Sequence, residues 1–267
     1  MAGHVTDPVG VFDSGVGGVS VLREIRRELP AEDLSYVADS EYAPYGDRPA
    51  VFIIERSIAM VQFLERQGAK AVVVACNTAT GIAVDTLRAR FTIPIVAIEP
   101  AVKPAVSQTR SGVIGVLATT QTISSPRFSK LVDAHAAGVR VVAQASPGLV
   151  EQVEAGELSG ETTRSLVEQY VRPLLDQGAD TIVLGCTHYP FLSAVIEDVA
   201  GPGVTVIDPA VAVARELRRR LQVSGLLAPD TRTGAERFWT TGPPEQVQTV
   251  IAQLWGKTVE VKRVSPS

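Results

Sequence analysis

The sequence predicts an α/β fold with mainly parallel sheets, and the first observation behind this prediction is alternation. Short runs rich in Val, Ile and Leu alternate with segments of helical apolar spacing along almost the whole chain. The second observation is that the short runs are almost continuously apolar, as in strands that helices cover on both faces. Together these features favour parallel sheets sandwiched between helices.

The predicted elements follow one another in order along the chain. Helical spacing is clearest at residues 19–29, 58–64 and 166–175. Residues 237–261 predict a short strand, a helix that starts after a pair of prolines, and a final strand. The other predicted strands are residues 9–13, 34–38, 71–75, 95–98, 113–118, 139–145, 181–185 and 204–207.

Composition narrows the classes of protein. The chain has 267 residues, of which 45% are hydrophobic and 20% charged, as in globular proteins with a full core. Its net charge of −4 does not indicate binding to nucleic acid. The arginine run at residues 218–220 predicts a solvent-exposed helix face. No apolar run reaches the roughly 20 residues that cross a bilayer, and the first residues lack a secretory signal. We therefore expect a cytoplasmic protein without membrane contact.

The two cysteines of the chain occupy the same kind of position. Cys76 and Cys186 each follow an apolar strand and precede small polar residues and a predicted helix start. This repetition indicates a duplicated plan, in which each cysteine anchors its own α/β unit. A free cysteine is often only a small buried hydrophobe, and that alternative stays open. A helix N-terminus lowers the pKa of a thiol, so we also expect reactive thiols at both positions.

The chemistry that two equivalent thiols suit best is inversion at a carbon centre. With Cys76, Cys186 and His188 the chain lacks a recognisable zinc ligand set, so we expect no metal. A hydrolase with a single nucleophile would leave one cysteine idle. Inversion without a cofactor needs one group that removes a proton from one face and a similar group that delivers a proton to the other.

A glycine-rich turn follows the first predicted strand. Residues 13–18 read D-S-G-V-G-G, which fits neither the dinucleotide fingerprint nor a P-loop. Its backbone N–H groups could bind a carboxylate as well as a phosphate, although it could also be a plain strand–helix turn. Asp13 and His188 are candidates to support the thiols, with helix capping and simple burial as the alternatives. His4 and His135 have no such context, and we predict them at the surface.

Five motifs together resemble one family. They are D-S-G-V-G-G-V-S-V-L-R-E-I, Y-A-P-Y-G-D-R, V-V-V-A-C-N-T-A-T, G-V-L-A-T-T-Q-T and I-V-L-G-C-T-H-Y-P. In this order they look like the glutamate racemases of the cofactor-independent aspartate/glutamate racemase superfamily. The similarity runs from about residue 9 to about residue 210.

The resemblance implies two α/β domains that face each other across an active-site cleft. The first would comprise residues 1–98 plus 210–267, and the second residues 99–209. It implies interconversion of L- and D-glutamate without a cofactor, which supplies D-glutamate for peptidoglycan. It also implies a homodimer, and some members are reported to bind DNA gyrase. Members controlled by a cell-wall precursor carry a longer N-terminal extension, so the resemblance does not extend to that control.

The resemblance also assigns roles to residues of this chain. Cys76 would deprotonate D-glutamate and Cys186 would deprotonate L-glutamate, with Asp13, His188 and Glu154 as further catalytic residues. Many members have cysteine at the position of Ser146, outside the catalytic pair, so this difference leaves the mechanism intact. The implied substrate-binding residues are Asp13, Ser14, Pro44, Tyr45, Gly46, Asn77, Thr78, Thr119, Thr122, Thr187 and His188.

Two other functions compete with this interpretation. A racemase of the same superfamily that acts on aspartate or another amino acid would use the same thiols. A binding or regulatory protein on the same fold would use none of this chemistry. A comparison of the turnover of glutamate and of aspartate would distinguish the first alternative from a glutamate racemase. A chain that has no racemase activity but still binds a partner would favour the second.

Overall fold

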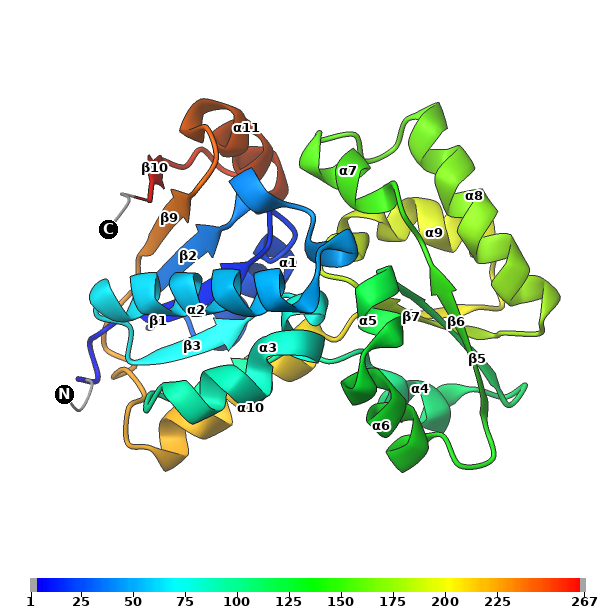
Figure 1. The fold of residues 1–267 in the computed structure, drawn as a ribbon, viewed down its shortest axis with the longest axis horizontal. Helices are drawn as coiled ribbons and strands as arrows, with labels where there is room; N and C mark the ends of the chain where they lie inside the picture. Colours follow the sequence, from blue (N-terminus) through cyan, green and yellow to red (C-terminus); the bar gives the residue numbers. More distant parts are fainter. Residues whose placement is uncertain (1–3, 265–267) are drawn as a thin grey trace.

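The computed structural model describes residues 4–264 and contains two sheets of parallel strands (Figure 1). One sheet has six strands in the order β10-β9-β2-β1-β3-β4, and the other has four in the order β6-β5-β7-β8. Every strand pair is parallel. The expected α/β fold with parallel sheets is therefore confirmed.

The strands lie where the apolar runs predict them, and the eight strands from β1 to β8 begin and end within one residue of the predicted bounds. Strand β9 begins one residue before the predicted start at 237, whereas β10 ends at Arg263, two residues beyond the predicted end at 261. The strands are β1 (Val9–Asp13), β2 (Leu34–Ala38), β3 (Ala71–Val74), β4 (Ile95–Ala97), β5 (Val113–Ala118), β6 (Arg140–Ala145), β7 (Thr181–Gly185), β8 (Thr205–Ile207), β9 (Glu236–Thr240) and β10 (Val261–Arg263).

Helices connect every pair of strands that is consecutive in the described chain. The α-helices are α1 (Val19–Glu28), α2 (Ala50–Arg66), α3 (Asn77–Arg90), α4 (Val102–Gln108), α5 (Thr120–Ser124), α6 (Pro126–His135), α7 (Leu149–Glu154), α8 (Glu161–Asp176), α9 (Ser193–Ala200), α10 (Ala210–Val223) and α11 (Pro244–Trp255). Short 3₁₀ turns are η1 (Ser40–Tyr42), η2 (Tyr45–Asp47) and η3 (Tyr189–Leu192).

Strand β1 shows why both faces of the six-stranded sheet are apolar. Successive side chains of a strand point to opposite faces. Val9 and Val11 pack in the hydrophobic cluster that contains α1 and α10, whereas Phe12 packs in the cluster formed with α2 and α3. Gly10 leaves room for Leu64 of α2, because a Cβ there would lie 2.9 Å from the Leu64 Cδ1 atom. The helices thus form a layer on each face, as Figure 1 shows.

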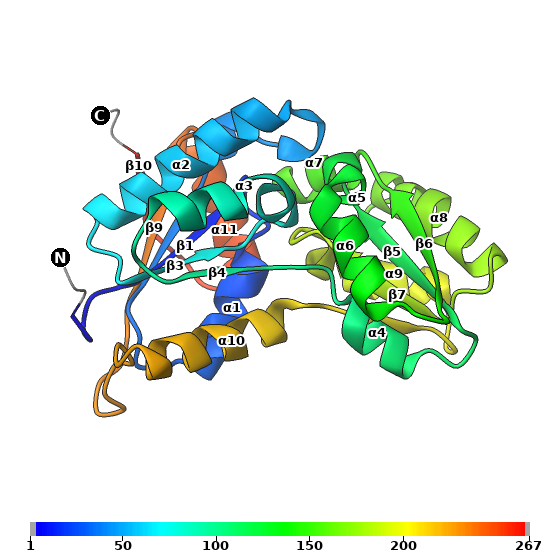
Figure 2. The ribbon, with the colours of Figure 1, turned by 60° about the horizontal axis from the view of Figure 1, so that its bottom comes forward.

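One hydrophobic cluster extends through both parts of the molecule. It joins residues of β1 and α1 to residues of α7, α8 and α9, which cover the four-stranded sheet. The chain passes to that sheet after β4 and returns by α10, which packs on α1 (Figure 2). The domain limits, residues 1–98 with 210–267 and residues 99–209, remain a prediction.

The surface predictions also hold. The three arginines at positions 218–220 are exposed on α10, and His4 and His135 are exposed. Among residues 4–264, the structure has no helix of the length and apolarity that crossing a membrane requires.

Candidate active site

The carboxylate of Asp13 organises the turn that leads from β1 to α1. Asp13 is fully buried, and its oxygens accept hydrogen bonds from the backbone N–H of Ser14 at 2.7 Å and of Gly18 at 2.6 Å. It also accepts a bond from the Thr187 hydroxyl at 3.1 Å, which links β1 to the loop after β7. Asp13 therefore organises the turn and joins the two sheets, but it does not cap α1 as one alternative expected, because the N-cap residue is Gly18 and no side chain caps this helix. Burial raises its pKa more than His188 and the bonds with Cys76 and Ser14 lower it.

The glycines of this turn make space for side chains that arrive from the other sheet. Neither Gly15 nor Gly17 has a positive φ, so backbone freedom does not explain them. A Cβ at Gly15 would lie 1.8 Å from a carboxylate oxygen of Glu154, and one at Gly17 would lie 2.3 Å from Nδ1 of His188. The Glu154 carboxylate accepts a bond from the backbone N–H of Val16 at 2.8 Å. In this structure the turn therefore receives a carboxylate of the protein itself.

Cys76 lies at the start of α3, as predicted. It is the N-cap residue, and its Sγ accepts a bond from the Ala79 N–H at 3.4 Å. The Ser14 hydroxyl lies 3.4 Å from the same sulfur. The expectation of a lowered thiol pKa is wrong for Cys76: burial and then the negative charge of Asp13 raise it, and they outweigh the bonds from Ser14 and Ala79.

Cys186 forms the second thiol site together with His188 and Glu154. Its Sγ lies 3.6 Å from Nδ1 of His188, and Nε2 of His188 lies 2.7 Å from a Glu154 carboxylate oxygen. Burial lowers the pKa of His188, but its hydrogen bonds and charge interactions with Cys186 and Glu154 raise it by more, well above the usual value. The helix start expected after Cys186 takes the form of the 3₁₀ turn η3, with Pro190 in its first turn, and α9 continues from Ser193.

Hydroxyl groups from both sheets meet beside Cys76. Thr78 at the start of α3 lies 2.8 Å from the Thr119 hydroxyl and 3.3 Å from that of Thr122. Asn77 is buried, and neither its amide nitrogen nor its amide oxygen has a hydrogen-bond partner among the described residues. Because an unpaired buried amide is costly, Asn77 is the side chain here that most needs a ligand.

The loop with Pro44, Tyr45 and Gly46 reaches the same junction. Pro44 and Gly46 line a cavity of about 20 Å³ together with Thr119 and Ser146. The Tyr45 hydroxyl turns away and donates to the carboxylate of Asp39. Burial and then the charge of Asp39 raise the pKa of Tyr45, which keeps this hydroxyl protonated. The Tyr45 hydroxyl is therefore not free to meet a ligand, whereas Pro44 and Gly46 line the cavity.

Three residues at this junction escape prediction from the sequence. Asp39 directly follows β2, much as Asp13 ends β1, and the Asp39 N–H donates to the Asp13 carbonyl at 3.0 Å. This repeated pattern of an acid after an apolar strand was the available signal. Arg56 holds Asp39 with two bonds of 2.9 and 2.7 Å, and Ser20 donates to the Thr187 carbonyl at 2.9 Å. Nothing in the sequence marks these last two.

The thiols, carboxylates and imidazole of this junction fit acid–base chemistry. Both cysteines are free and buried. Across residues 4–264, no group of three or more His, Cys, Asp and Glu side chains could hold a metal ion. Two thiols, each with an acid–base partner, therefore form the candidate active site.

Comparison with known proteins agrees with this geometry. The model of the Asp/Glu/hydantoin racemases matches residues 9–217. A glutamate racemase from Methylococcus capsulatus is 54% identical over 248 residues, which are 93% of this chain and 92% of the relative. The chain belongs to the Asp/Glu/hydantoin racemase family. The family resemblance of the motifs is confirmed, and so is the expected class of isomerase, an amino-acid racemase.

Solved structures of racemases share the fold over the whole chain. Glutamate racemase isoform RacE1 from Bacillus anthracis matches with a TM-score of 0.90 at 36% identity, over 98% of both chains. Glutamate racemase from Escherichia coli, in complex with L-glutamate and the activator UDP-MurNAc-Ala, matches with a TM-score of 0.84 at 31% identity. That match covers 97% of this chain and 98% of the Escherichia coli chain.

The glycine turn of this racemase family member gives a direct test of the close approach. We expect Gly17→Ala to lower the free energy of unfolding by about 1–3 kcal/mol, because the new methyl group overlaps His188. Urea unfolding measures the loss. Gly203→Ala is the matched control, since a Cβ at Gly203 meets nothing within 4 Å and its φ is not positive. Equal stability of the two variants would contradict the packing of His188 on the turn.

Proposed function

We propose that this chain interconverts L- and D-glutamate with Cys76 and Cys186 acting on opposite faces of the Cα atom. The observation that carries the proposal is that each thiol contacts its own polar partner at one junction between the sheets. The Ser14 hydroxyl lies beside Cys76, and His188 lies beside Cys186. Two hydrogen bonds support this arrangement. The Val16 N–H donates to Glu154 of α7, and the Thr187 hydroxyl donates to Asp13, so both bonds join the turn after β1 to the part of the chain around Cys186.

In the proposed reaction, one cysteine as thiolate removes the Cα proton, and the other as thiol donates a proton to the opposite face. The electron pair of the broken C–H bond moves toward the α-carboxylate and returns when the new C–H bond forms. Asp13 would exchange a proton with Cys76, and His188 with Cys186. The raised pKa of Cys76 makes its thiolate a stronger base but a rarer species, so Asp13 would have to accept the thiol proton before Cys76 acts on Cα.

By the family resemblance, Cys76 would act on D-glutamate and Cys186 on L-glutamate. Glu154 would position His188, because it accepts a bond from the ring nitrogen that faces away from Cys186. It would thereby set which nitrogen faces the thiol.

Neutral donors at the junction suit the two carboxylates of glutamate. The free amide of Asn77 and the hydroxyl of Thr78 can donate to carboxylate oxygens, and we propose that the hydroxyls of Ser14 and Thr187, which donate to Asp13 in this structure, turn to the substrate when it binds. The Escherichia coli relative was solved with L-glutamate, which supports glutamate as the substrate. We further propose that Thr119 and Thr122 shape this pocket with the backbone of residues 44–46.

The proposed product, D-glutamate, would serve peptidoglycan synthesis. This role places the enzyme in the cytoplasm, where reducing conditions keep both thiols free for catalysis. We also propose a homodimer as the working assembly, which size-exclusion chromatography with light scattering would test.

The deciding experiment is incubation with L-glutamate in D₂O without added pyridoxal phosphate. We expect the optical rotation to decay to zero while deuterium appears at Cα. Change with aspartate but not with glutamate would keep the thiol pair and overturn the substrate. No change with either amino acid, with both cysteines reduced, would overturn the proposed reaction.

A further inference from the structure

A second hollow lies at the same edge of the six-stranded sheet but away from the thiols. Its cavity of about 440 Å³ is lined by η1, by one face of α2 and by the carboxyl ends of β9 and β10. Carboxyl ends of parallel strands are where α/β proteins bind ligands, and this volume is typical of small-molecule sites. Nothing in the proposed racemase reaction uses this cavity.

The floor of the cavity is apolar and partly aromatic. Ala59, Met60 and Phe63 lie along one face of α2, because residues three and four positions apart share a helix face. Tyr42 adds a second ring, and Val264 closes the far side. Such a surface favours a ligand with a flat apolar body.

Arginines give the cavity its charge. Arg56 is already neutralised by Asp39 and stacks on the Tyr42 ring, 3.8 Å from its centroid. Arg66 and Arg263 are exposed, and no carboxylate within residues 4–264 pairs with either.

Among residues 4–264, Glu41 is the only acidic side chain in the lining, so the two unpaired arginines outweigh it. The planar guanidinium group of arginine binds phosphate and carboxylate groups with two parallel hydrogen bonds. A positively charged rim above an apolar floor therefore selects an anion with an apolar body.

We propose that this cavity binds a small anionic ligand, an aromatic or similarly flat molecule that carries a phosphate or carboxylate group. Arg66 and Arg263 would bind the anionic group, and Phe63 and Met60 would contact the apolar body. The ligand would also touch Arg56, which holds Asp39 and through it the Tyr45 hydroxyl. The Arg56–Asp39 ion pair would therefore connect this cavity to the loop of residues 44–46.

Calorimetric titration of the full chain tests the proposal with defined probes. We expect saturable binding of phenyl phosphate or benzoate, at least tenfold tighter than binding of inorganic phosphate or of neutral benzyl alcohol. Preference between phenyl phosphate and benzoate would show whether the site takes phosphates or carboxylates. Because racemase activity is not the readout, failure here is distinct from failure of the proposed function.

Charge reversal assigns the binding to this cavity. We expect Arg66→Glu combined with Arg263→Glu to weaken probe binding at least tenfold. Arg215→Glu is the matched control, an exposed arginine on α10 outside the cavity lining, and it should leave affinity unchanged. Absence of saturable binding to the wild-type chain, or equal binding by the double variant, would overturn the proposal.

Discussion

Replacing either cysteine by alanine is expected to reduce racemisation of glutamate by a factor of about 10² to 10⁴. Each thiol is proposed as an acid–base group at Cα, and loss of one such group typically costs two to four orders of magnitude in rate. Cys76 and Cys186 are the only cysteines of the chain, so no other thiol can replace either. Polarimetry started from each pure enantiomer measures the loss.

The single variants should also differ from each other in a way that simple damage would not reproduce. Cys76→Ala keeps Cys186, which can still remove and return the Cα proton of L-glutamate. It should therefore exchange deuterium into L-glutamate only. Cys186→Ala should exchange deuterium into D-glutamate only. Mass spectrometry after chiral separation distinguishes the two products.

The control for this pair is Ser57→Ala. Ser57 is buried on α2, and its hydroxyl has no hydrogen-bond partner among the described residues, so full activity is expected. Urea unfolding of all variants shows whether they remain folded. A single cysteine variant with full racemase activity would exclude the two-thiol mechanism. Exchange into the same enantiomer by both variants would exclude the proposed division of labour.

Strands and the thiol positions follow from the sequence because they depend on local pattern. Strand β1 is fully buried and is apolar up to its last residue, Asp13, where the chain reaches the sheet edge and turns. This rule was enough to place Asp13, Cys76 and Cys186 at carboxyl ends of strands. The carboxyl edge of a parallel sheet then makes them candidates for one site.

Contacts between the two parts of the molecule could not be predicted from the local sequence pattern. Gly15 and Gly17 suggested an anion-binding turn, but their purpose depends on Glu154 and His188, which lie far away in the chain. The pKa of Cys76 is a further example, because the helix terminus was visible in the sequence whereas its burial beside Asp13 was not. Long-range packing decides both features.

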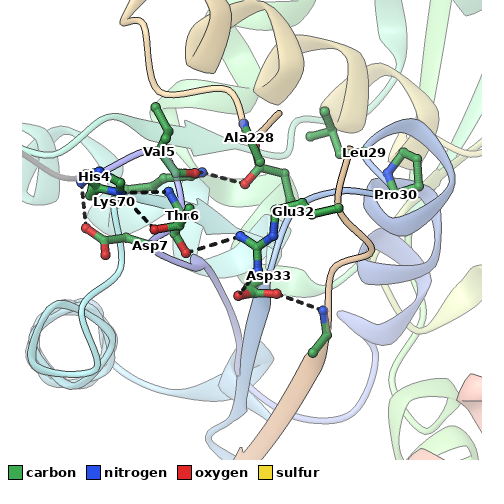
Figure 3. Close-up of polar contacts among 12 residues, drawn as sticks. His4, Val5, Thr6, Asp7, Leu29, Pro30, Glu32, Asp33, Lys70 and Ala228 are labelled. Carbon is green, nitrogen blue, oxygen red and sulfur yellow. Dashed lines mark hydrogen bonds and ion pairs between the residues drawn. The ribbon is translucent and has the colours of Figure 1, made fainter. Parts of the chain in front are cut away.

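A buried ion pair at the opposite edge of the sheet is another long-range feature that the sequence did not predict. Lys70, just before β3, and Glu32, just before β2, are both almost fully buried, and the Lys70 Nζ atom lies 2.5 Å from a Glu32 carboxylate oxygen (Figure 3). Lys70 also donates to the Val5 carbonyl at 2.5 Å, and Glu32 accepts from the Ala228 N–H at 2.7 Å. Four separate segments of the chain are therefore joined here.

We expect Lys70→Met to lower the free energy of unfolding by about 3–5 kcal/mol, because it leaves the Glu32 charge buried without a partner. Adding Glu32→Gln should recover most of this loss, since a neutral amide oxygen can still accept the Ala228 N–H. Urea unfolding of the single and double variants measures both changes.

Lys262→Met is the matched control. Its ion pair with Glu260 is exposed and 3.8 Å long, so a change within about 0.5 kcal/mol is expected. The racemase activity of the folded Lys70 variants should stay close to that of the wild type, because the pair lies at the amino ends of β2 and β3 and the thiols lie beyond the carboxyl ends. If the double variant were no more stable than Lys70→Met, then the unpaired charge would not be the source of the loss. Lys70 would then act through its bond to Val5 and through packing alone.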